Sequence, residues 1–464
     1  MGAMTPLPRT AAGSPRRTAP QPPGLPLLGN FVALQRKGQL QYNFDNWRQY
    51  GDIVRLQLGP YTAHTVAHPD YIRHVLIDNR QNYSRGRGYE PLKLLTGLGL
   101  LTNEGESWQR QRRLIQPAFT PKAVPQYAGA IAESVGAMLT RWSRIGARGA
   151  VLDINVEMLS LAFNIIGRTM FSLDLDAEAR ELVKAFTTAV PLVGARITAA
   201  VDIPLRVPTP ANRRLVRAVR TLDTRIYGIM AGRAKSGLRH GDLLDKLLAA
   251  RDAEHGGAGM SPRQVRDEVM TIFFAGHETI AQTLSWAWYL LAQHPVVEEA
   301  LHAELATLNG RPPTVADLPK LAYTRMVIEE TMRLYPAVWA IPRGTIGNDE
   351  VGGYHIPAGS MMFPAPYLAH RHPAFWDDPE RFDPTRFTPE RVAARPAGAY
   401  LPFGAGPRAC IGQNFAMQEA LLVLATVAQR YRLRLVPGHP VVPHSAITLS
   451  PRYGVRMTLA ARNT

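Results

Sequence analysis

The sequence predicts a mainly α fold with a minor β-rich region, formed as one large domain over residues 24–464. Apolar residues recur at intervals of three and four beyond about residue 105, which indicates amphipathic helices. Strand-like stretches occur near residues 53–67 and 337–365. Because the Pro- and Gly-rich stretches are short and scattered, and no repeat of fixed period stands out, we expect no division into several domains.

Residues 1–23 are predicted to be a disordered Pro/Arg-rich segment. They contain no acidic residue and too few apolar residues to order themselves. They also lack an apolar run long enough for a membrane span or a signal peptide. A mitochondrial transit peptide is the alternative, but the prolines disfavour the amphipathic helix that it requires. We therefore expect a cytoplasmic protein with no membrane span.

The first elements of the domain are expected to be a short helix and a hairpin. The helix is predicted near residues 38–50, after a turn-rich entry at 24–30. Two strands, Ile53–Leu58 and Tyr61–Ala67, are separated by Gly-Pro, which indicates a hairpin. Further along, a loop-rich meander is expected over roughly residues 366–405, followed by a helix that starts near residue 412.

The clearest predicted helix runs from Pro262 to Gln293. Ser261 is a good N-cap, proline suits the first helical position, and Gln264 completes a capping box. Pro295 is expected to end the helix. At 1.5 Å per residue its length is about 48 Å, so it must cross a whole domain.

The chain has one cysteine, Cys410, which excludes intramolecular disulfides and multi-cysteine zinc or iron–sulfur sites. The formal net charge of +16 favours acidic partners, nucleic acid or an anionic surface. The arginines are dispersed and no nucleic-acid motif appears, so we expect no nucleic-acid binding. A biased genome composition explains much of the charge.

The strongest chemical signal surrounds Cys410. Gly404 and Gly406 permit a tight turn, and the cysteine directly precedes an apolar helix, whose dipole and free N–H groups stabilise a thiolate. Gly412 leaves room for a flat ligand beside the backbone. A thiolate axial ligand on heme iron favours cleavage of the O–O bond. The alternative interpretation is a buried structural cysteine behind a Gly-rich turn.

The pattern Phe403-x-x-Gly406-x-Arg408-x-Cys410-x-Gly412 resembles the heme-binding signature of the cytochrome P450 family. Three further motifs follow the family's order and spacing, and the resemblance covers nearly the whole chain from about residue 21. It implies the cytochrome P450 fold, with heme b between the long central helix and the cysteine-bearing helix. Cys410 would be the metal ligand, and Phe403, Arg408 and Gly412 would contact the cofactor.

The second motif, Ala275-Gly-His277-Glu278-Thr279, is similar to the family's oxygen-activation motif. The Thr279 hydroxyl can bond back to the Ala275 carbonyl, which loosens the helix locally. The resemblance implies that Glu278 and Thr279 form the catalytic proton-delivery pair and that Ala275 lies beside the cofactor. His277 is expected to be structural. The alternative is an acid on a solvated face and a threonine merely tolerated in a helix.

In the third motif, Glu330 and Arg333 share one helical face, which alone indicates a commonplace ion pair. In the family, the equivalent Glu and Arg and a third residue, an arginine of the meander, stabilise the cysteine-bearing region. Arg386 has the usual distance to the cysteine, whereas Arg381 lies in the better literal motif match. We expect Glu330, Arg333 and Arg386 to be structural, with Arg381 as the alternative third member.

The fourth motif places Trp108 and Arg112 on one side of a helix. The resemblance implies that both bind a heme propionate, and that Arg343 and Arg408 are further propionate partners; arginine suits bidentate carboxylate binding. For any single arginine in so basic a chain, solubility is the alternative explanation.

The substrate pocket is read from the resemblance, and its residues are mainly apolar, which suits a hydrophobic small molecule. The expected lining residues are Thr271, Phe274, Val338, Trp339, Ile341 and Ile447. The same residues would equally form ordinary core. Residues 334–339 and 204–225 resemble, weakly, bacterial family members that oxidise terpenes.

These features predict a monomeric heme-thiolate monooxygenase that uses dioxygen. Electrons are expected to reach it from NAD(P)H through a separate ferredoxin or flavodoxin and its reductase, with Arg110 and Arg113 facing outward on the cysteine side as part of the docking surface. The alternatives are a peroxide-using or non-hydroxylating heme-thiolate enzyme, fatty acid or polyketide substrates, and a heme-binding sensor without turnover.

Overall fold

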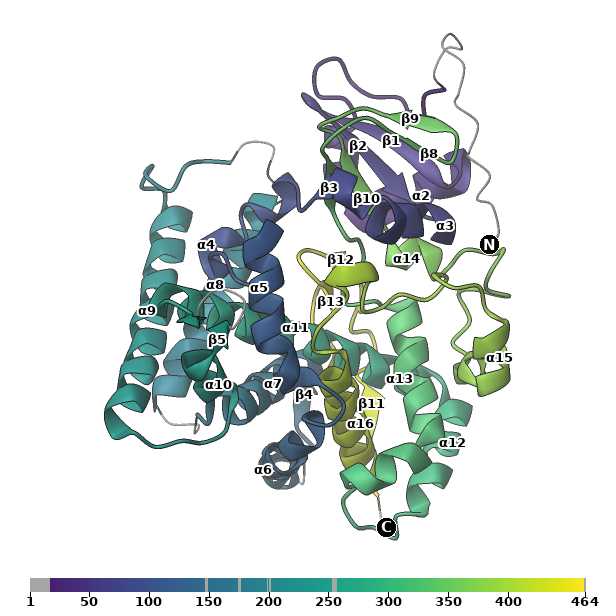
Figure 1. Cartoon of the computed structure of the whole chain (residues 1–464). Helices are drawn as coiled ribbons and strands as arrows, with labels where there is room; N and C mark the ends of the chain where they lie inside the picture. Colours follow the sequence, from purple (N-terminus) through teal and green to yellow (C-terminus); the bar gives the residue numbers. More distant parts are fainter. Residues whose placement is uncertain are drawn as a thin grey trace, which may run out of the picture.

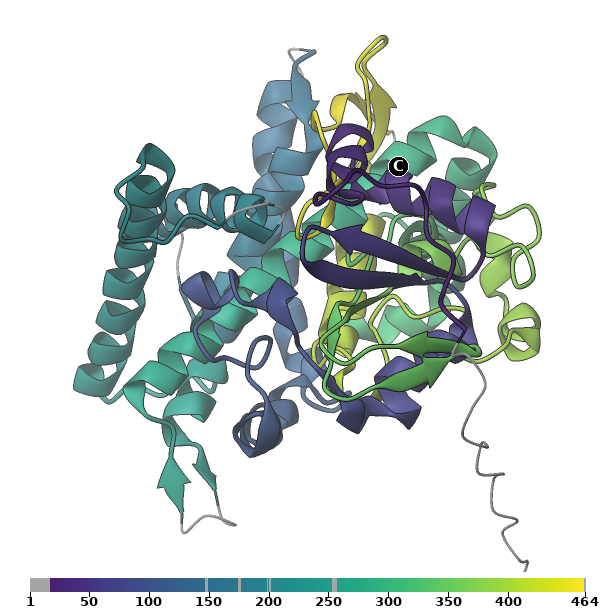
Figure 2. The same cartoon turned by 90° about the horizontal axis from the view of Figure 1, so that it is seen from above.

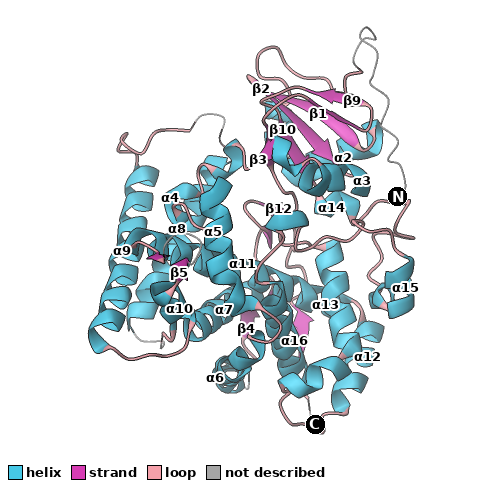
Figure 3. Cartoon of the chain, viewed as in Figure 1, coloured by secondary structure: helices cyan, strands magenta, loops and turns pink. Residues whose placement is uncertain are grey.

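The computed structural model describes residues 17–146, 149–173, 177–197, 199, 202–252 and 257–462. Helices make up most of it and the strands form small sheets, so the predicted mainly α fold with a minor β-rich region is confirmed (Figures 1 and 3). The largest sheet lies at one end of the molecule, away from the helix pair α8 and α9 (Figure 1). The helices are α1 (Phe31–Lys37), α2 (Gln39–Tyr50), α3 (Pro69–Arg73), α4 (Lys93–Thr96), α5 (Gly105–Ile115), α6 (Ala128–Gly146), α7 (Ile154–Phe171), α8 (Ala177–Ile197), α9 (Pro210–Ser236), α10 (Leu243–Ala249), α11 (Pro262–Gln293), α12 (Pro295–Ala306), α13 (Ala322–Leu334), α14 (Pro366–Ala369), α15 (Pro389–Ala394) and α16 (Gln413–Arg430).

The sheet at the N-terminal end has the strand order β1-β2-β10-β7-β3. The predicted hairpin is present, since β1 and β2 are antiparallel with Leu58 opposite Tyr61, and β2 continues the sheet through a parallel pairing with β10. The remaining strands form short antiparallel pairs and a three-stranded sheet beside α6 and α16. The strands are β1 (Ile53–Leu58), β2 (Tyr61–Val66), β3 (Tyr83–Ser84), β4 (Val151–Asp153), β5 (Arg251–Asp252), β6 (Ala258–Gly259), β7 (Arg343–Thr345), β8 (Asp349–Val351), β9 (Tyr354–Ile356), β10 (Met361–Pro364), β11 (Tyr431–Leu435), β12 (Pro443–Ser445), β13 (Leu449–Pro451) and β14 (Arg456–Ala461).

Helix α11 crosses the molecule from the β5–β6 hairpin toward the centre (Figure 2). It has the predicted bounds, and both bonds of the capping box between Ser261 and Gln264 are present. Pro295 does more than end α11, because it is the first residue of α12. The helix packs against α7, α13 and α16, and most of its residues are buried. Among the described residues, no helix is both long and apolar enough to cross a membrane.

The prediction of disorder over residues 1–23 is wrong for its last part. Residues 1–16 lie outside the described residues, but Ala19 is buried, and the Pro20 carbonyl accepts a hydrogen bond from the Arg55 N–H. The Asn30 amide donates to the carbonyls of Pro22 and Pro23. Proline lacks an N–H but keeps a carbonyl acceptor, so an extended proline-rich segment can still be fixed by donors that the domain supplies.

Candidate active site

Cys410 lies in the loop between a short 3₁₀ turn, Gly406–Arg408, and the N-terminus of α16. Its N–H donates to the Phe403 carbonyl at 2.9 Å, which closes the loop. Gly406 has a φ of 71°, and a Cβ at this position would come within 2.4 Å of the Leu76 carbonyl oxygen. Only glycine therefore lets the loop lie so close to the preceding segment.

Cys410 is exposed as a residue, although protein atoms surround its sulfur. Burial raises the pKa of the thiol, while the Gly412 N–H, which donates to the sulfur, and the Arg112 guanidinium act in the opposite direction. Since burial outweighs both, the protein alone does not hold a stable thiolate. A coordinated metal ion deprotonates a thiol outright, so a metal-bearing ligand would supply the missing stabilisation.

Four arginines, Arg85, Arg112, Arg343 and Arg408, interact electrostatically with one another near this loop. Within the described ranges none of them forms an ion pair with a carboxylate. Burial, together with repulsion from Arg85 and Arg343, lowers the pKa of Arg408 to about 9. Glu104 acts on Arg343 and Arg408 from beyond ion-pair distance, so the four arginines keep an excess of positive charge. Such a cluster is suited to an anionic ligand.

Helix α5 joins these arginines to the cysteine loop. The guanidinium carbon of Arg408 lies 4.1 Å from the centre of the Trp108 ring, and that of Arg112 lies 5.8 Å from it. Arg112 donates to the Ala409 carbonyl at 3.0 Å, and Arg408 donates to the Asn103 carbonyl at 2.9 Å. The structure thus brings together the residues that the fourth motif and the cysteine motif predicted separately.

Sequence reasoning missed Arg85 and Tyr89. Burial raises the pKa of the Tyr89 hydroxyl, but the positive charges of Arg85 and Arg343 outweigh burial, and the net shift is downward. The Arg85 guanidinium carbon lies 4.7 Å from the centre of the Tyr89 ring. The neighbouring Arg87 instead donates to Tyr61 at the surface. Nothing in the local sequence Arg-Gly-Arg-Gly-Tyr separates the buried arginine from the exposed one.

The middle of α11 contains the predicted bond from a threonine side chain to the helix backbone. The Thr279 hydroxyl donates to the Ala275 carbonyl at 2.8 Å. Most residues in this part of α11 are buried, including Phe274, but Ala275 is exposed. This small residue therefore faces an open space. His277 points elsewhere: its ring lies against Phe163 and Phe186, which accords with the expected structural role.

Glu278 is directed away from Thr279 and toward the C-terminal turn between β12 and β13. Its Oε1 accepts a hydrogen bond of 2.7 Å from the Thr448 hydroxyl, and its buried Oε2 has no partner in the described chain. Burial raises the pKa of Glu278 to about 7, and the Thr448 bond opposes the rise. A pKa near neutrality is the value at which a carboxyl is most effective as a general acid or base.

Comparison with known proteins identifies the family. The family model "Cytochrome P450" matches residues 20–454. The chain belongs to the cytochrome P450 family. It is 39% identical to cyclooctat-9-en-7-ol 5-monooxygenase of Streptomyces melanosporofaciens over 94% of each protein, and 33% identical to pentalenene oxygenase of Streptomyces avermitilis over 95% of this chain and 97% of that one. A crystal structure of the cytochrome P450DA heme domain superposes with a TM-score of 0.88 at 25% identity and covers 96% of this chain and 98% of that one.

The P450 family implies a heme, and the residues of this chain fit one. Cys410 is exposed, and a Cβ on Gly412 would lie 3.9 Å from its sulfur, so the backbone leaves room for a flat group. The positive charge of the four arginines exceeds the negative charge of Glu104, the described carboxylate near them, and a heme brings two carboxylates. Arg85 also has a buried Nε without a partner in the described residues.

The third motif forms a buried network in this P450. Arg333 pairs with Glu330 through two bonds of 2.6 and 2.7 Å, and both side chains are fully buried. Arg386 lies 3.5 Å from a Glu330 oxygen, whereas Arg381 offers Arg333 only its backbone carbonyl. The geometry therefore favours Arg386 over Arg381 as the third member.

The residues expected to line the substrate pocket separate into two groups. Thr271 and Phe274 are buried on α11, and the Thr271 hydroxyl has no partner in the described chain. Ile447 contacts α8, since a Cβ on Gly194 would lie 3.4 Å from it. The others are Val338, which is exposed, and Trp339 and Ile341, which belong to buried hydrophobic clusters near the N-terminal sheet.

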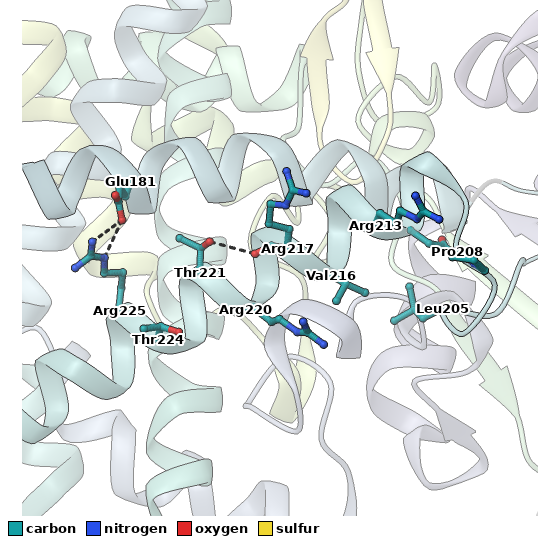
Figure 4. Close-up of a pocket in the computed structure, with 11 residues that line it drawn as sticks. Glu181, Leu205, Pro208, Arg213, Val216, Arg217, Arg220, Thr221, Thr224 and Arg225 are labelled. Atoms are coloured by element: carbon teal, nitrogen blue, oxygen red, sulfur yellow. Dashed lines mark hydrogen bonds and ion pairs between the residues drawn. The ribbon is translucent and has the colours of Figure 1, made fainter.

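A groove of about 720 Å³ lies between α8 and α9, and none of its lining residues belongs to the four motifs. Arg225 pairs there with Glu181, while Arg213, Arg217 and Arg220 extend without an ion pair in the described chain (Figure 4). This groove is basic and open, unlike the apolar pocket expected beside Ala275, so we place the chemistry at Cys410 and α11.

Proposed function

We propose that this P450 hydroxylates or otherwise oxidises a cyclic terpene or terpene alcohol, with heme b held by Cys410. The observation that carries the substrate class is the 39% identity, over 94% of the chain, to a relative named for oxidation of a terpene alcohol. The buried, mainly apolar lining of α11 supports it, because Thr271 offers one hydroxyl to a substrate that is otherwise hydrophobic.

Each group of the site has a part in this function. Heme iron with a thiolate ligand supplies activation of dioxygen and transfer of one oxygen atom. Cys410 provides the thiolate, and Arg112, Arg343 and Arg408 bind the carboxylates. Glu278 and Thr279 move protons to the oxygen side. The overall balance is substrate, dioxygen, two electrons and two protons to oxidised product and water, with the electrons from NAD(P)H through a separate ferredoxin or flavodoxin in the cytoplasm.

The cofactor and its ligand are tested by the absorption spectrum of the reduced protein under carbon monoxide. We expect the red-shifted Soret band of a thiolate-ligated complex in the wild type and its loss in Cys410→Ser. A heme-replete wild-type protein without that band would reject the thiolate assignment.

The substrate class is tested by titrating the ferric protein with cyclooctat-9-en-7-ol, a long-chain fatty acid and a macrolide polyketide. We expect the terpene alcohol alone to displace a ligand from the iron and shift the Soret band. With labelled dioxygen, the label should enter the product. Unlabelled product would favour the peroxide-using alternative, and lack of oxygen consumption with a competent ferredoxin and reductase would favour the sensor.

A further inference from the structure

The turn between β12 and β13 contacts α11 at the acid of the oxygen-activation motif. The Thr448 hydroxyl donates to Glu278 across 170 positions of sequence, and Thr448 is only 3% exposed. Burial and this hydrogen bond set the pKa of the Glu278 carboxyl, and no charged side chain of the described residues shifts it further. Thr448 is thus the polar group that fixes the carboxyl in place.

The turn that carries Thr448 is itself held in place. The Trp286 indole N–H of α11 donates to the Leu449 carbonyl at 2.9 Å, and the Leu449 N–H donates to the Ala337 carbonyl at the same distance. Inside the turn, the Ala446 N–H donates to the Thr448 carbonyl at 3.1 Å. On the outer side, Ile447 packs against α8. The hydroxyl therefore comes from a fixed position rather than from a free loop.

Glu278 and Thr279 have separate partners in this arrangement. The Thr279 hydroxyl bonds to Ala275, and the Glu278 carboxyl bonds to Thr448. Neighbouring residues of a helix point about 100° apart, so the carboxyl must leave Thr448 by rotation of its side chain to approach Thr279. Its second oxygen has no partner in the described chain, and one hydrogen bond therefore sets its resting orientation.

We infer that Thr448 is a positioning residue that holds Glu278 in its resting orientation and thereby controls how protons reach Thr279. The inference deepens the proposed function and rests on it for the role of Glu278. The contact itself is independent of the substrate's identity.

The first test is the titration of the Glu278 carboxyl in the purified full-length ferric protein. Infrared difference spectra would follow the C=O stretch of the protonated acid, and the band would be assigned by its loss in Glu278→Gln. We expect Thr448→Val, which is nearly isosteric, to shift the titration to higher pH and to move the band, because the variant loses the one hydrogen bond that the described residues donate to the carboxyl. Thr448→Ser should restore both. An unchanged band and titration in Thr448→Val would overturn the inference.

The second test is a double-mutant cycle on peroxide release during NADPH-driven oxygen consumption with a plant-type ferredoxin and its reductase. Thr448→Val should change the fraction of electrons lost as peroxide by several-fold and alter its pH profile, but add nothing in the Glu278→Gln background. Equal effects in both backgrounds would show that Thr448 acts only on the fold and would overturn the inference. Failure of the proposed function would give a different set of results. The thiolate band and the oxygen consumption would be absent, while Thr448→Val would still shift the infrared titration.

Discussion

At the scale of single residues, the arginines beside Cys410 lie close together and form no ion pair with a carboxylate of the described residues. Elsewhere in the protein buried guanidiniums are neutralised: Arg233 binds Asp242 and Asp245, and Arg266 binds Asp223. The pKa of Arg233 is raised by its acids, whereas burial and neighbouring cations lower that of Arg408. The cluster thus carries more positive charge than the nearby Glu104 balances, which suits it to a ligand with carboxylates.

Arg408→Gln should therefore weaken heme binding without unfolding the protein. The variant loses a charged partner for a heme carboxylate, so we expect heme transfer to apomyoglobin to be about tenfold faster, equivalent to ~1.4 kcal/mol. Relief of repulsion in the cluster should keep the thermal midpoint of the heme-free protein within a few degrees of wild type. The exposed Arg220→Gln is the matched control, and equal heme loss in both variants would contradict the role of Arg408.

Glu268 makes stability depend on pH. Its Oε2 accepts the Leu100 N–H at 2.9 Å, its Oε1 has no partner in the described chain, and burial raises the pKa of the carboxyl to about 8 from an ordinary value of 4.5. The folded state therefore holds a proton that the unfolded state releases, so stability is fully present below 4.5 and is lost as pH rises toward 8.

Glu268→Gln should remove this part of the pH dependence, which amounts to at most about 1.4 kcal/mol per pH unit. Urea unfolding at pH 5 and pH 9 would measure it, with the exposed Glu350→Gln as control. The variant should gain stability relative to wild type at pH 9 and not at pH 5. If the free energy of unfolding of Glu268→Gln depends on pH as steeply as that of the wild type, other groups cause the dependence.

At this scale the sequence predicted types of residue better than their contacts. Cys410, Thr279 and the Glu330–Arg333 pair follow from local spacing, since their partners are within a few positions or within one turn of helix. The bond from Thr448 to Glu278 spans 170 positions, and no periodicity reports a contact of that kind. Arg85 was missed for the same reason.

At the scale of elements, the network of Glu330, Arg333 and Arg386 joins α13 to the meander. Besides its pair with Glu330, Arg333 donates to the carbonyls of His370, Pro379 and Arg381, so one side chain satisfies several groups of a segment with little regular structure. Removing one partner of a fully buried pair leaves an uncompensated charge, which costs far more than a surface pair contributes.

Arg333→Ala should lower the free energy of unfolding by about 3–5 kcal/mol. Arg386→Ala should lower the free energy of unfolding by less, about 1 kcal/mol, because the contact of Arg386 with Glu330 is longer. The loss is not zero, since the variant also loses the hydrogen bond to the Asp378 carbonyl. Arg381→Ala, whose side chain is exposed, should change stability by less than ~0.5 kcal/mol. Denaturant unfolding ranks the three, and a larger loss for Arg381→Ala than for Arg386→Ala would reverse our assignment.

The boundaries of elements were predictable where a local rule sets them. The capping box fixed the start of α11, and Gly-Pro marked the β1–β2 hairpin. Pro295 ends α11 as predicted and is also the first residue of α12, because a proline that ends one helix is equally suited to start the next. Local rules failed at residues 17–23, where the donors that order the segment come from distant positions such as Asn30 and Arg55.

At the scale of the whole molecule, the net charge of +16 predicts attraction to an acidic electron carrier. Arg113 is exposed on α5, next to the arginine that binds the cysteine loop, whereas Arg110 is half-buried and donates to the Gly259 carbonyl. Arg113 is thus the better placed of the two residues that we expected to face the carrier.

The rate of reduction by an acidic ferredoxin should fall several-fold as salt rises from about 50 to 500 mM, because screening shortens the reach of surface charges. Arg113→Glu should slow reduction at low salt more than Arg220→Glu, which changes the net charge equally but lies in the α8–α9 groove. Stopped-flow kinetics would measure both. A rate that is insensitive to salt, or equal in the two variants, would reject docking beside Cys410.

Because Cys410 is the one cysteine among 464 residues, its alkylation can also measure how much of the protein has bound its cofactor. A maleimide can modify a molecule at one thiol only, and Cys410 is accessible in the bare polypeptide. Coordination of that sulfur blocks alkylation, so the intact mass after a timed pulse divides any preparation into a labelled and an unlabelled population. The ratio of unlabelled to labelled protein gives the fraction of molecules that contain heme, with no extinction coefficient and no engineered tag.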